Sequence, residues 1–195
     1  NERKRVFQHS DYNYRNDTKE IRKSDWTAKS TPESLLKRHV ELTGPGNNKK
    51  MVINAMNSKA NSYMLDIEDS MSPTWDNVVN SHKNILPAVL NDLRYVTNKK
   101  DYTILNAEPP TLHVRARGLH MSENNVKNSA NVPIQATLFD IATHLFNNGK
   151  TLSEKGLGPY MYITKLESYE EAIYVNDLLL STEKYLGLEP NSTKV

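Results

Sequence analysis

Residues 63–77, which read YMLDIEDSMSPTWDN, indicate the fold class of this chain. The stretch opens with a short apolar run, Tyr63 to Ile67, of the kind found in strands that are buried on both faces of a parallel sheet. Acidic residues follow, and then the signals of a helix start: Ser72 suits an N-cap, Pro73 the first helical position and Asp76 the first turn. We therefore predict a strand that ends in carboxylates and passes directly into a helix.

The same alternation of strand and helix extends outward in both directions. The helix is expected to continue from Trp75 to Leu93 along an apolar stripe of helical period, with a kink or a restart at Pro87. Further elements are predicted from local patterns. The strands are at residues 39–43, 51–56, 102–105, 111–115 and 160–166, with turns at 44–48 and 106–110. The turn at 106–110 is expected to join its two flanking strands in a hairpin. One helix is predicted around 138–145, ending near 147–149, and a last helix runs from the capping box of Ser168 and Glu171 to Gly187.

Strands that alternate with helices imply βαβ units and a parallel sheet, so the predicted fold class is α/β. Roughly the first 35 residues are polar and highly charged and hold no sustained apolar period. We interpret residues 1–37 as an N-terminal arm, and a disordered tail explains residues 1–15 equally well. Residues 38–195 are then the folded domain.

Composition excludes several classes of protein. The 195 residues carry 25 Lys and Arg against 23 Asp and Glu, a balance that argues against a nucleic-acid binder, which is normally strongly basic. No apolar run approaches the roughly 20 residues that span a bilayer, and the charged residues Asn1 to Arg5 are followed by no apolar core, so neither a membrane protein nor a secreted one is expected. The absence of cysteine excludes disulfides and thiolate chemistry.

Polar side chains follow three of the predicted strands, where the chemistry of parallel α/β folds is found. They are Asp66, Glu68 and Asp69 after the first, Arg115 and Arg117 after the second, and Lys165 and Glu167 after the third. Together these side chains are expected to line one cavity with carboxylates and guanidinium groups. Carboxylates can hold a hard cation such as Mg²⁺ or its waters, and an arginine can stabilise an oxyanion. Each group also has a simpler interpretation, because carboxylates complement a helix dipole and most arginines form surface ion pairs. His113 and His120 have no second ligand at metal-binding spacing and are interpreted as structural.

Six collinear strings resemble the malate synthase family. They are TKEIRKSDW at 18–26, RHVELTGP at 38–45, MVINAMNS at 51–58, MLDIEDSMSPTWDN at 64–77, VRARGLHM at 114–121 and GPYMYITKLES at 158–168. The resemblance implies a TIM-barrel catalytic domain that condenses acetyl-CoA with glyoxylate and water to malate and CoA, the reaction of the glyoxylate cycle. It implies Mg²⁺ as the ion that polarises glyoxylate, and an Asp that removes a proton from the acetyl group.

By motif position, the resemblance assigns catalysis to Arg115, which stabilises the enolate; a proton-transfer role is disfavoured by the very high pKa of arginine. Asp66, Glu68 and Asp69 are expected to support the metal or its waters without binding the ion directly. Arg115, Lys165 and Glu167 are expected to bind substrate.

The chain departs from the family pattern in two ways. Ala116, Leu119 and Thr164 replace Pro, Trp and Pro, which affects backbone stiffness and packing more than charge. The family's two direct Mg²⁺ ligands and its catalytic base are expected beyond Val195. We therefore expect about the first half of a barrel, an incomplete one, and negligible turnover by the 195-residue chain alone.

Two alternatives remain open. One is a non-catalytic relic or interaction fragment of the family, and the other is a related Mg²⁺-dependent lyase that acts on carbon–carbon bonds of acyl-CoA substrates. The resemblance implies a cytoplasmic or a peroxisomal (glyoxysomal) location. The sequence predicts no oligomeric state.

Overall fold

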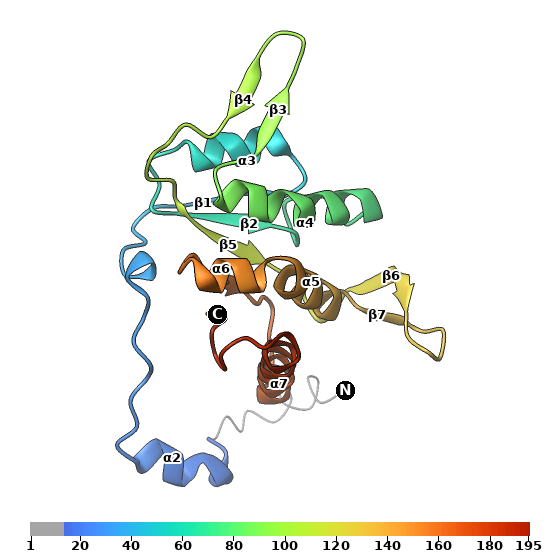
Figure 1. The fold of residues 1–195 in the computed structure, drawn as a ribbon. Coiled ribbons are helices and arrows are strands. Elements are labelled where there is room, and N and C mark those ends of the chain that lie inside the picture. Colours follow the sequence, from blue (N-terminus) through green and yellow to red (C-terminus); the bar gives the residue numbers. More distant parts are fainter. Residues whose placement is uncertain (1–13) are drawn as a thin grey trace. The chain divides into compact units, whose positions relative to one another are not determined.

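The computed structural model describes residues 14–195, and its contacts divide the chain after Leu36. The segment up to Leu36 holds the 3₁₀ turn η1 (Asn16–Thr18), the short helix α2 (Lys19–Lys23) and the turn η2 (Glu33–Leu35), drawn in blue in Figure 1. None of its described residues is buried. Residues 1–13, which hold most of the tail considered above, lie outside the described residues, and the arm over residues 1–37 stays a prediction.

A parallel sheet of four strands organises the larger unit, Lys37 to Val195. Its order is β1 (Glu41–Pro45), β2 (Ser62–Asp66), β5 (Thr111–Arg115) and β8 (Met161–Tyr162), and every pair of neighbours is parallel. The register places the last residues of the strands side by side, since Asp66 is paired with both Pro45 and Arg115. The predicted α/β class with a parallel sheet is confirmed.

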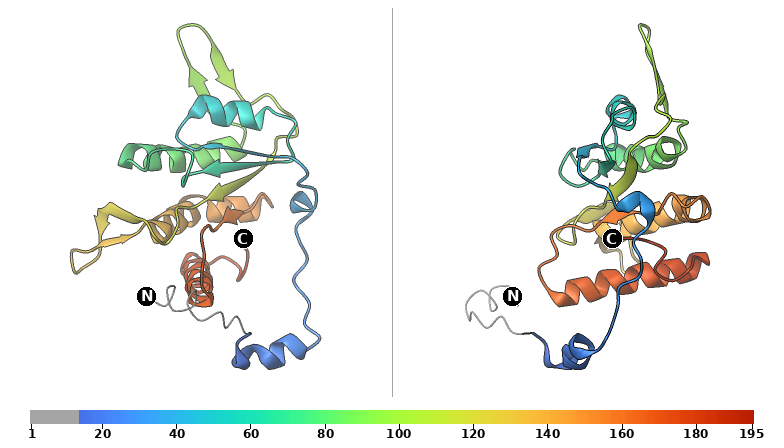
Figure 2. Two further views of the ribbon diagram at one scale, coloured as in Figure 1. Left: turned by 180° about the vertical axis from the view of Figure 1, so that it is seen from behind. Right: turned by 90° about the vertical axis from the view of Figure 1, so that its left-hand side faces the viewer.

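Helices follow the strands in chain order across one face of the sheet (Figures 1 and 2). They are α3 (Lys49–Met56), α4 (Trp75–Val89), α5 (Ala136–His144), the π-helical turn η3 (Leu145–Gly149), α6 (Lys150–Glu154) and α7 (Tyr169–Leu186). No helix between residues 14 and 195 combines the length and the apolar character that crossing a membrane requires.

The core lies between the sheet and these helices. Tyr63 and Leu65 of β2 are buried with Val52 of α3 and Ile85 of α4, while Met161 of β8 is buried in a second cluster with α5 and α7. Side chains alternate along a strand, so the neighbouring residues of β2 face the other side of the sheet. Repeated strand–helix units with helices on one face are consistent with a TIM barrel. That the barrel is incomplete stays a prediction.

The predicted hairpin of residues 102–105 with 111–115 is wrong. The strand β4 (Asp101–Thr103) pairs antiparallel with β3 (Arg94–Val96), whereas β5 pairs with β2. The side chain of Asn57 explains the difference, because it donates to the carbonyl of Thr103 (2.8 Å) and accepts from the amide of Leu105 (2.6 Å). These bonds attach the end of β4 to the end of α3. A second hairpin, β6 (Ser122–Lys127) with β7 (Pro133–Gln135), was not predicted.

The predicted strand at residues 51–56 is also wrong, because this stretch forms α3. The side chain of Asn48 accepts from the backbone amide of Met51 (3.1 Å), which is the geometry of a helix N-cap. The buried residues Val52, Ile53 and Met56 then fall on one helical face. A short apolar run fits either structure, and the cap decides it here.

Several predicted boundaries move. Thr74, not Ser72, is the N-cap of α4, and the helix continues to Val89 with Pro87 in its last turn, so it does not restart. The helix expected to stop near 147–149 instead continues through η3 into α6. Gly149 there has a helical φ of −54° and is buried, and an added Cβ would lie 3.1 Å from Leu188.

The last part of the chain confirms one prediction and shortens another. Only Met161–Tyr162 of the predicted strand at 160–166 pairs with β5. The helix α7 begins and ends as predicted. The hydroxyl of Ser168 accepts from the amide of Glu171, and Gly187 has a left-handed φ of 68°.

A pair of substitutions separates the observed cap of α4 from the predicted one. Thr74→Ala removes the side chain that accepts from the Asn77 amide and should lower the free energy of unfolding by about 1 kcal/mol. Ser72→Ala should have little effect, because Ser72 contributes a backbone carbonyl to the Asn77 side chain. Urea unfolding of both variants measures the difference, and equal losses would contradict the assignment.

Burial of His144 predicts a pH dependence of stability. Burial, with the nearby His82 as a smaller cause, lowers the pKa of His144 to about 3. Between about pH 6.5 and pH 3 the unfolded chain binds a proton at this position and the folded chain does not. The free energy of unfolding should therefore fall as the pH drops from about 6.5 towards 3, by up to about 1.4 kcal/mol per pH unit from this group.

Urea unfolding between pH 7 and pH 5 measures this slope. His144→Gln should reduce it, whatever the variant's stability at pH 7. The same substitution at the exposed His39 is the matched control and should leave the slope as in the parent chain. An undiminished slope in His144→Gln would show that other groups cause it.

Candidate functional site

The candidate site lies where β2 and β5 end, on the face of the sheet away from the helices. Asp66 is the last residue of β2 and Arg115 the last of β5, and the two are paired in the sheet register. Their side chains form a bidentate ion pair: Nε of Arg115 donates to Oδ1 of Asp66 (2.8 Å) and Nη2 donates to Oδ2 (2.6 Å). The predicted meeting of acidic and basic strand ends occurs at this pair.

Both members of the pair are held in their charged forms. Burial raises the pKa of Asp66, but hydrogen bonds from Arg115, Ser70 and the Glu68 amide outweigh it and keep the pKa below its usual value. The hydrogen bonds to Asp66 in turn raise the pKa of Arg115, against the effect of burial. The Asp66 carboxylate is fully buried and both of its oxygens accept hydrogen bonds.

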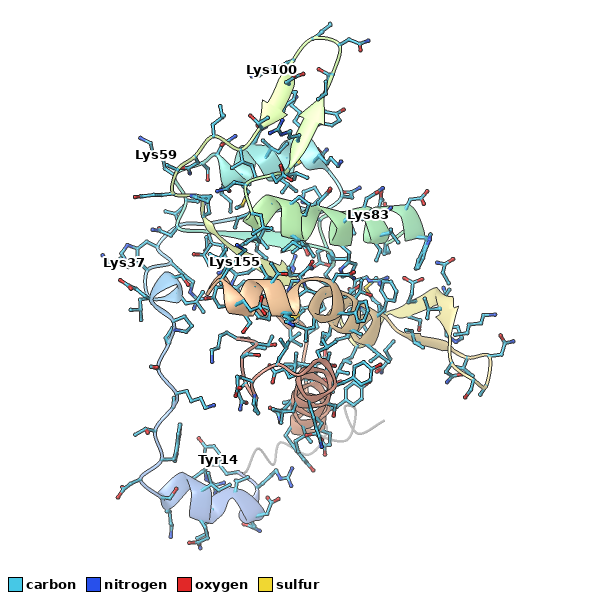
Figure 3. The ribbon with its side chains drawn as sticks, in the orientation of Figure 1. Tyr14, Lys37, Lys59, Lys83, Lys100 and Lys155 are labelled. Atoms are coloured by element: carbon cyan, nitrogen blue, oxygen red, sulfur yellow. The ribbon has the colours of Figure 1, made fainter. Side chains whose placement is uncertain are left out.

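Lys165 adds a second cation to the site. Its ammonium donates to Glu68 and to Asp69, the latter at 3.0 Å. The lysines labelled in Figure 3 are exposed on separate parts of the chain. Lys165 is also exposed (44%), but its ammonium contacts carboxylates that lie about a hundred residues earlier in the sequence. Its backbone has a φ of 58°, in the left-handed region that non-glycine residues rarely adopt.

Glu68 has the least satisfied side chain of the cluster. It is 1% exposed, and its Oε2 is buried with no hydrogen-bond partner, 3.9 Å from Nε of Arg115. Asp69 Oδ2 lies at the same distance from Nη2 of Arg115. The structure thus brings together five of the predicted site residues, three carboxylates and two cations: Asp66, Glu68, Asp69, Arg115 and Lys165.

Arg117 does not join this cluster, so the expectation that both arginines line one cavity is wrong. Its side chain is 1% exposed and pairs with Asp140 and Glu123, each at 2.9 Å. The strand ends at Arg115, so the alternation that would aim residues 115 and 117 to one side no longer applies. Arg117 turns towards α5 instead.

Glu167 is exposed and lies just before α7. Its backbone amide donates to the side chain of Glu171, within the cap of that helix. Its predicted role in binding substrate stays a prediction, as does that of Lys165.

Sequence reasoning missed Ser70, whose hydroxyl donates to Asp66 Oδ2. The signal was present, because a hydroxyl four residues after a strand-end carboxylate can reach it across a tight turn. It also missed Glu41 of β1, which accepts from Ser62 and from the Tyr162 hydroxyl, both at 2.9 Å. Glu41 and Tyr162 are 121 residues apart, and no local pattern joins them.

Within residues 14–195, no three His, Cys, Asp or Glu side chains are arranged to hold a metal ion. The carboxylates of the cluster already bind the side chains of Lys165 and Arg115. The arrangement can therefore present a fixed guanidinium to a developing negative charge, and it offers the unpaired Oε2 of Glu68 as an acceptor.

Comparison with known proteins gives consistent matches. Residues 111–195, which contain Arg115 and Lys165, match the family model of the malate synthase TIM barrel domain. The chain is 45% identical over 179 residues to the bifunctional glyoxylate cycle protein of Caenorhabditis elegans, covering 90% of this chain and 18% of that protein. It is 38% identical over 178 residues to a malate synthase of Myxococcus xanthus (91% and 32% covered) and 39% identical over 170 residues to a glyoxysomal malate synthase of Candida tropicalis (85% and 30%). The chain spans less than a third of the length of each.

Removing the charge of Asp66 tests the ion pair. Asp66→Asn leaves Arg115 without its buried counter-charge and should lower the free energy of unfolding at pH 7 by about 3 kcal/mol. Because the folded-state pKa of Asp66 is lowered, its stabilisation is present above about pH 4 and is lost as the pH falls through the folded-state pKa. The variant should therefore lose less stability than the parent chain on acidification below pH 4.

Urea unfolding at pH 7 and acid titration of the folded signal measure both effects. The control is Glu154→Gln, which removes an exposed pair with Lys150 (4.0 Å) and should change neither measurably. An Asp66→Asn variant as stable as the parent chain at pH 7 would contradict the assignment.

Proposed function

We propose that this chain, which belongs to the malate synthase family, forms part of an enzyme that condenses the acetyl group of acetyl-CoA with glyoxylate to give malate and CoA. The observation that carries the proposal is the bidentate pair of Arg115 with Asp66 at the carboxyl ends of neighbouring parallel strands. Active sites of TIM barrels are built at these strand ends.

Arg115 stabilises the enolate that forms when acetyl-CoA loses a proton. Its guanidinium stays charged at any working pH, so it acts electrostatically and does not move a proton. Asp66 engages Nε and Nη2 and leaves Nη1 for the substrate side. The ion pair thus holds the cation in one orientation before the reaction begins, which avoids reorganisation while charge develops.

Magnesium, when bound, polarises the aldehyde carbonyl of glyoxylate. Asp66 does not suit a direct ligand, because its oxygens already accept from Arg115, Ser70 and backbone amides. Glu68 suits an indirect role in holding the ion. Its Oε2 is buried without a hydrogen-bond partner and would be able to accept a hydrogen bond from a water of the ion. Asp69 adds negative charge beside it.

Lys165 supports these carboxylates from the segment that follows β8. Its positive charge offsets the repulsion between the carboxylates of Glu68 and Asp69, so these two acidic side chains can lie close together. The proposed role for Lys165 is therefore to set the position of Glu68 and the charge of the site. Substrate contacts by Lys165 and Glu167 remain predictions.

The name of the Candida tropicalis relative places that protein in the glyoxysome. We propose a glyoxysomal location for this chain, with the cytoplasm as the alternative compartment.

Substitution of Arg115 tests the function. In a protein that contains this chain together with the remaining length of its relatives, Arg115→Gln should lower kcat by a factor of about 10² to 10³. Arg115→Lys keeps the positive charge but not the bidentate contact with Asp66, so its kcat should lie between those of Arg115→Gln and the parent enzyme. Release of CoA from acetyl-CoA in the presence of glyoxylate measures turnover.

The control is Lys150→Gln, an exposed change on α6 that should leave kcat unaltered. An Arg115→Gln variant that is folded and turns over at the parent rate would contradict the proposal.

A further inference from the structure

A second buried cluster of charges lies on the helix side of β5, and it centres on Arg117. The guanidinium donates to Asp140 through Nε (3.0 Å) and Nη2 (2.9 Å), and to Glu123 through Nη1 (2.9 Å). The three residues are 1%, 0% and 3% exposed, so the cluster is closed to solvent. A buried arginine with this many bonds holds its surroundings in one arrangement.

The cluster continues the backbone pairing where the sheet ends. The amide of Ala116 makes the last bond to β8, with the Tyr162 carbonyl (3.2 Å). The next amide, of Arg117, donates to the side chain of Asp140 (2.9 Å), and the Arg117 carbonyl accepts from the hydroxyl of Thr137 (2.5 Å). Side chains of α5 therefore replace the sheet as partners of the backbone directly after Ala116.

His82 ties the cluster to α4. Burial raises the pKa of Asp140, but hydrogen bonds from His82 and Arg117 outweigh it and keep the carboxylate ionised. An ionised carboxylate can only accept, so His82 donates through Nε2, which lies 3.2 Å from Asp140 Oδ1. Two helices and the end of β5 thus meet at Asp140.

We propose that Arg117 and Asp140 are positioning residues for Arg115. The inference rests on the proposed function, in which Arg115 acts on the substrate. Arg115 and Arg117 are separated by Ala116 alone, whose small side chain is 1% exposed and leaves little room for the backbone to shift. Asp66 binds the guanidinium of Arg115, and the cluster fixes the main chain two residues further on, at the amide and carbonyl of Arg117.

The expected size of the effect follows from geometry. A displacement of about 1 Å in a catalytic group can lower turnover by about 10²-fold. In the complete protein, Arg117→Lys and Asp140→Asn should therefore lower kcat by about 10- to 100-fold and leave both KM values within about twofold, because neither residue faces the substrate.

A spectroscopic readout separates positioning from general stability. In the full 195-residue chain, the Nε–H group of Arg115 is bonded to Asp66, and its hydrogen exchange can be followed by ¹⁵N NMR. We expect Arg117→Lys to speed this exchange at least tenfold. The matched control is Glu183→Gln, which weakens another fully buried carboxylate that accepts from the Asn191 and Thr193 amides, far along the chain from β5.

The outcomes are distinguishable. Faster exchange at Arg115 and lower kcat in Arg117→Lys, with neither change in Glu183→Gln, support positioning. Unchanged exchange, or equal changes in both variants, would show that the cluster only stabilises the fold and would overturn the inference. If Arg117→Lys does not fold, Glu123→Gln is the second variant, because it weakens one contact of the same guanidinium. It should also speed hydrogen exchange at Arg115 Nε, by a smaller factor. Unchanged exchange in Glu123→Gln would overturn the inference.

The Arg115 variants test the proposed function separately. If Arg115→Gln keeps full turnover, the proposed function fails, although the effect of Arg117 on Arg115 exchange could still be observed. If Arg115→Gln loses turnover and Arg117→Lys does not, only the positioning role fails.

Discussion

The ion pair between Asp66 and Arg115 is the constraint on which the candidate site depends. It joins the ends of two neighbouring strands, with both oxygens of a fully buried carboxylate engaged. A buried charge without its partner is strongly destabilising, so the fully buried carboxylate of Asp66 requires Arg115. The strand register that pairs residues 66 and 115 is therefore also the arrangement that orients the guanidinium.

Local sequence patterns predicted the fold class and the parts that have local causes. The short apolar run of β2 and the capping box of α7 needed only neighbouring residues, and both are as predicted. The errors came where distant residues decide the structure. Residues 102–105 form no hairpin with β5, because Asn57, more than forty residues earlier, binds the backbone there. Residues 51–56 carry an apolar run that fits strand or helix, and Asn48 settles it as a helix.

The members of the cluster were predictable from the sequence, but their partners were not. The strand ends pointed to the carboxylates that the structure brings together with Arg115 and Lys165, because parallel strands end on one edge of a sheet. Their role in a functional site stays a prediction. The pattern could not separate Arg115 from Arg117, two residues apart and identical in type. What separates them is the point at which β5 ends, together with Asp140 of α5, which is 23 residues beyond Arg117 and offers it a buried carboxylate. One arginine faces the carboxylates of the strand ends and the other the helix layer.

The left-handed backbone of Lys165 has a consequence for anyone who redesigns this chain. At a φ of 58° the main chain favours glycine or asparagine, so a search for stabilising replacements would choose one of them. Either choice would relax the backbone and at the same time delete the ammonium that holds Glu68 and Asp69 together. Position 165 is thus one where the backbone conformation and the side-chain contacts favour different amino acids.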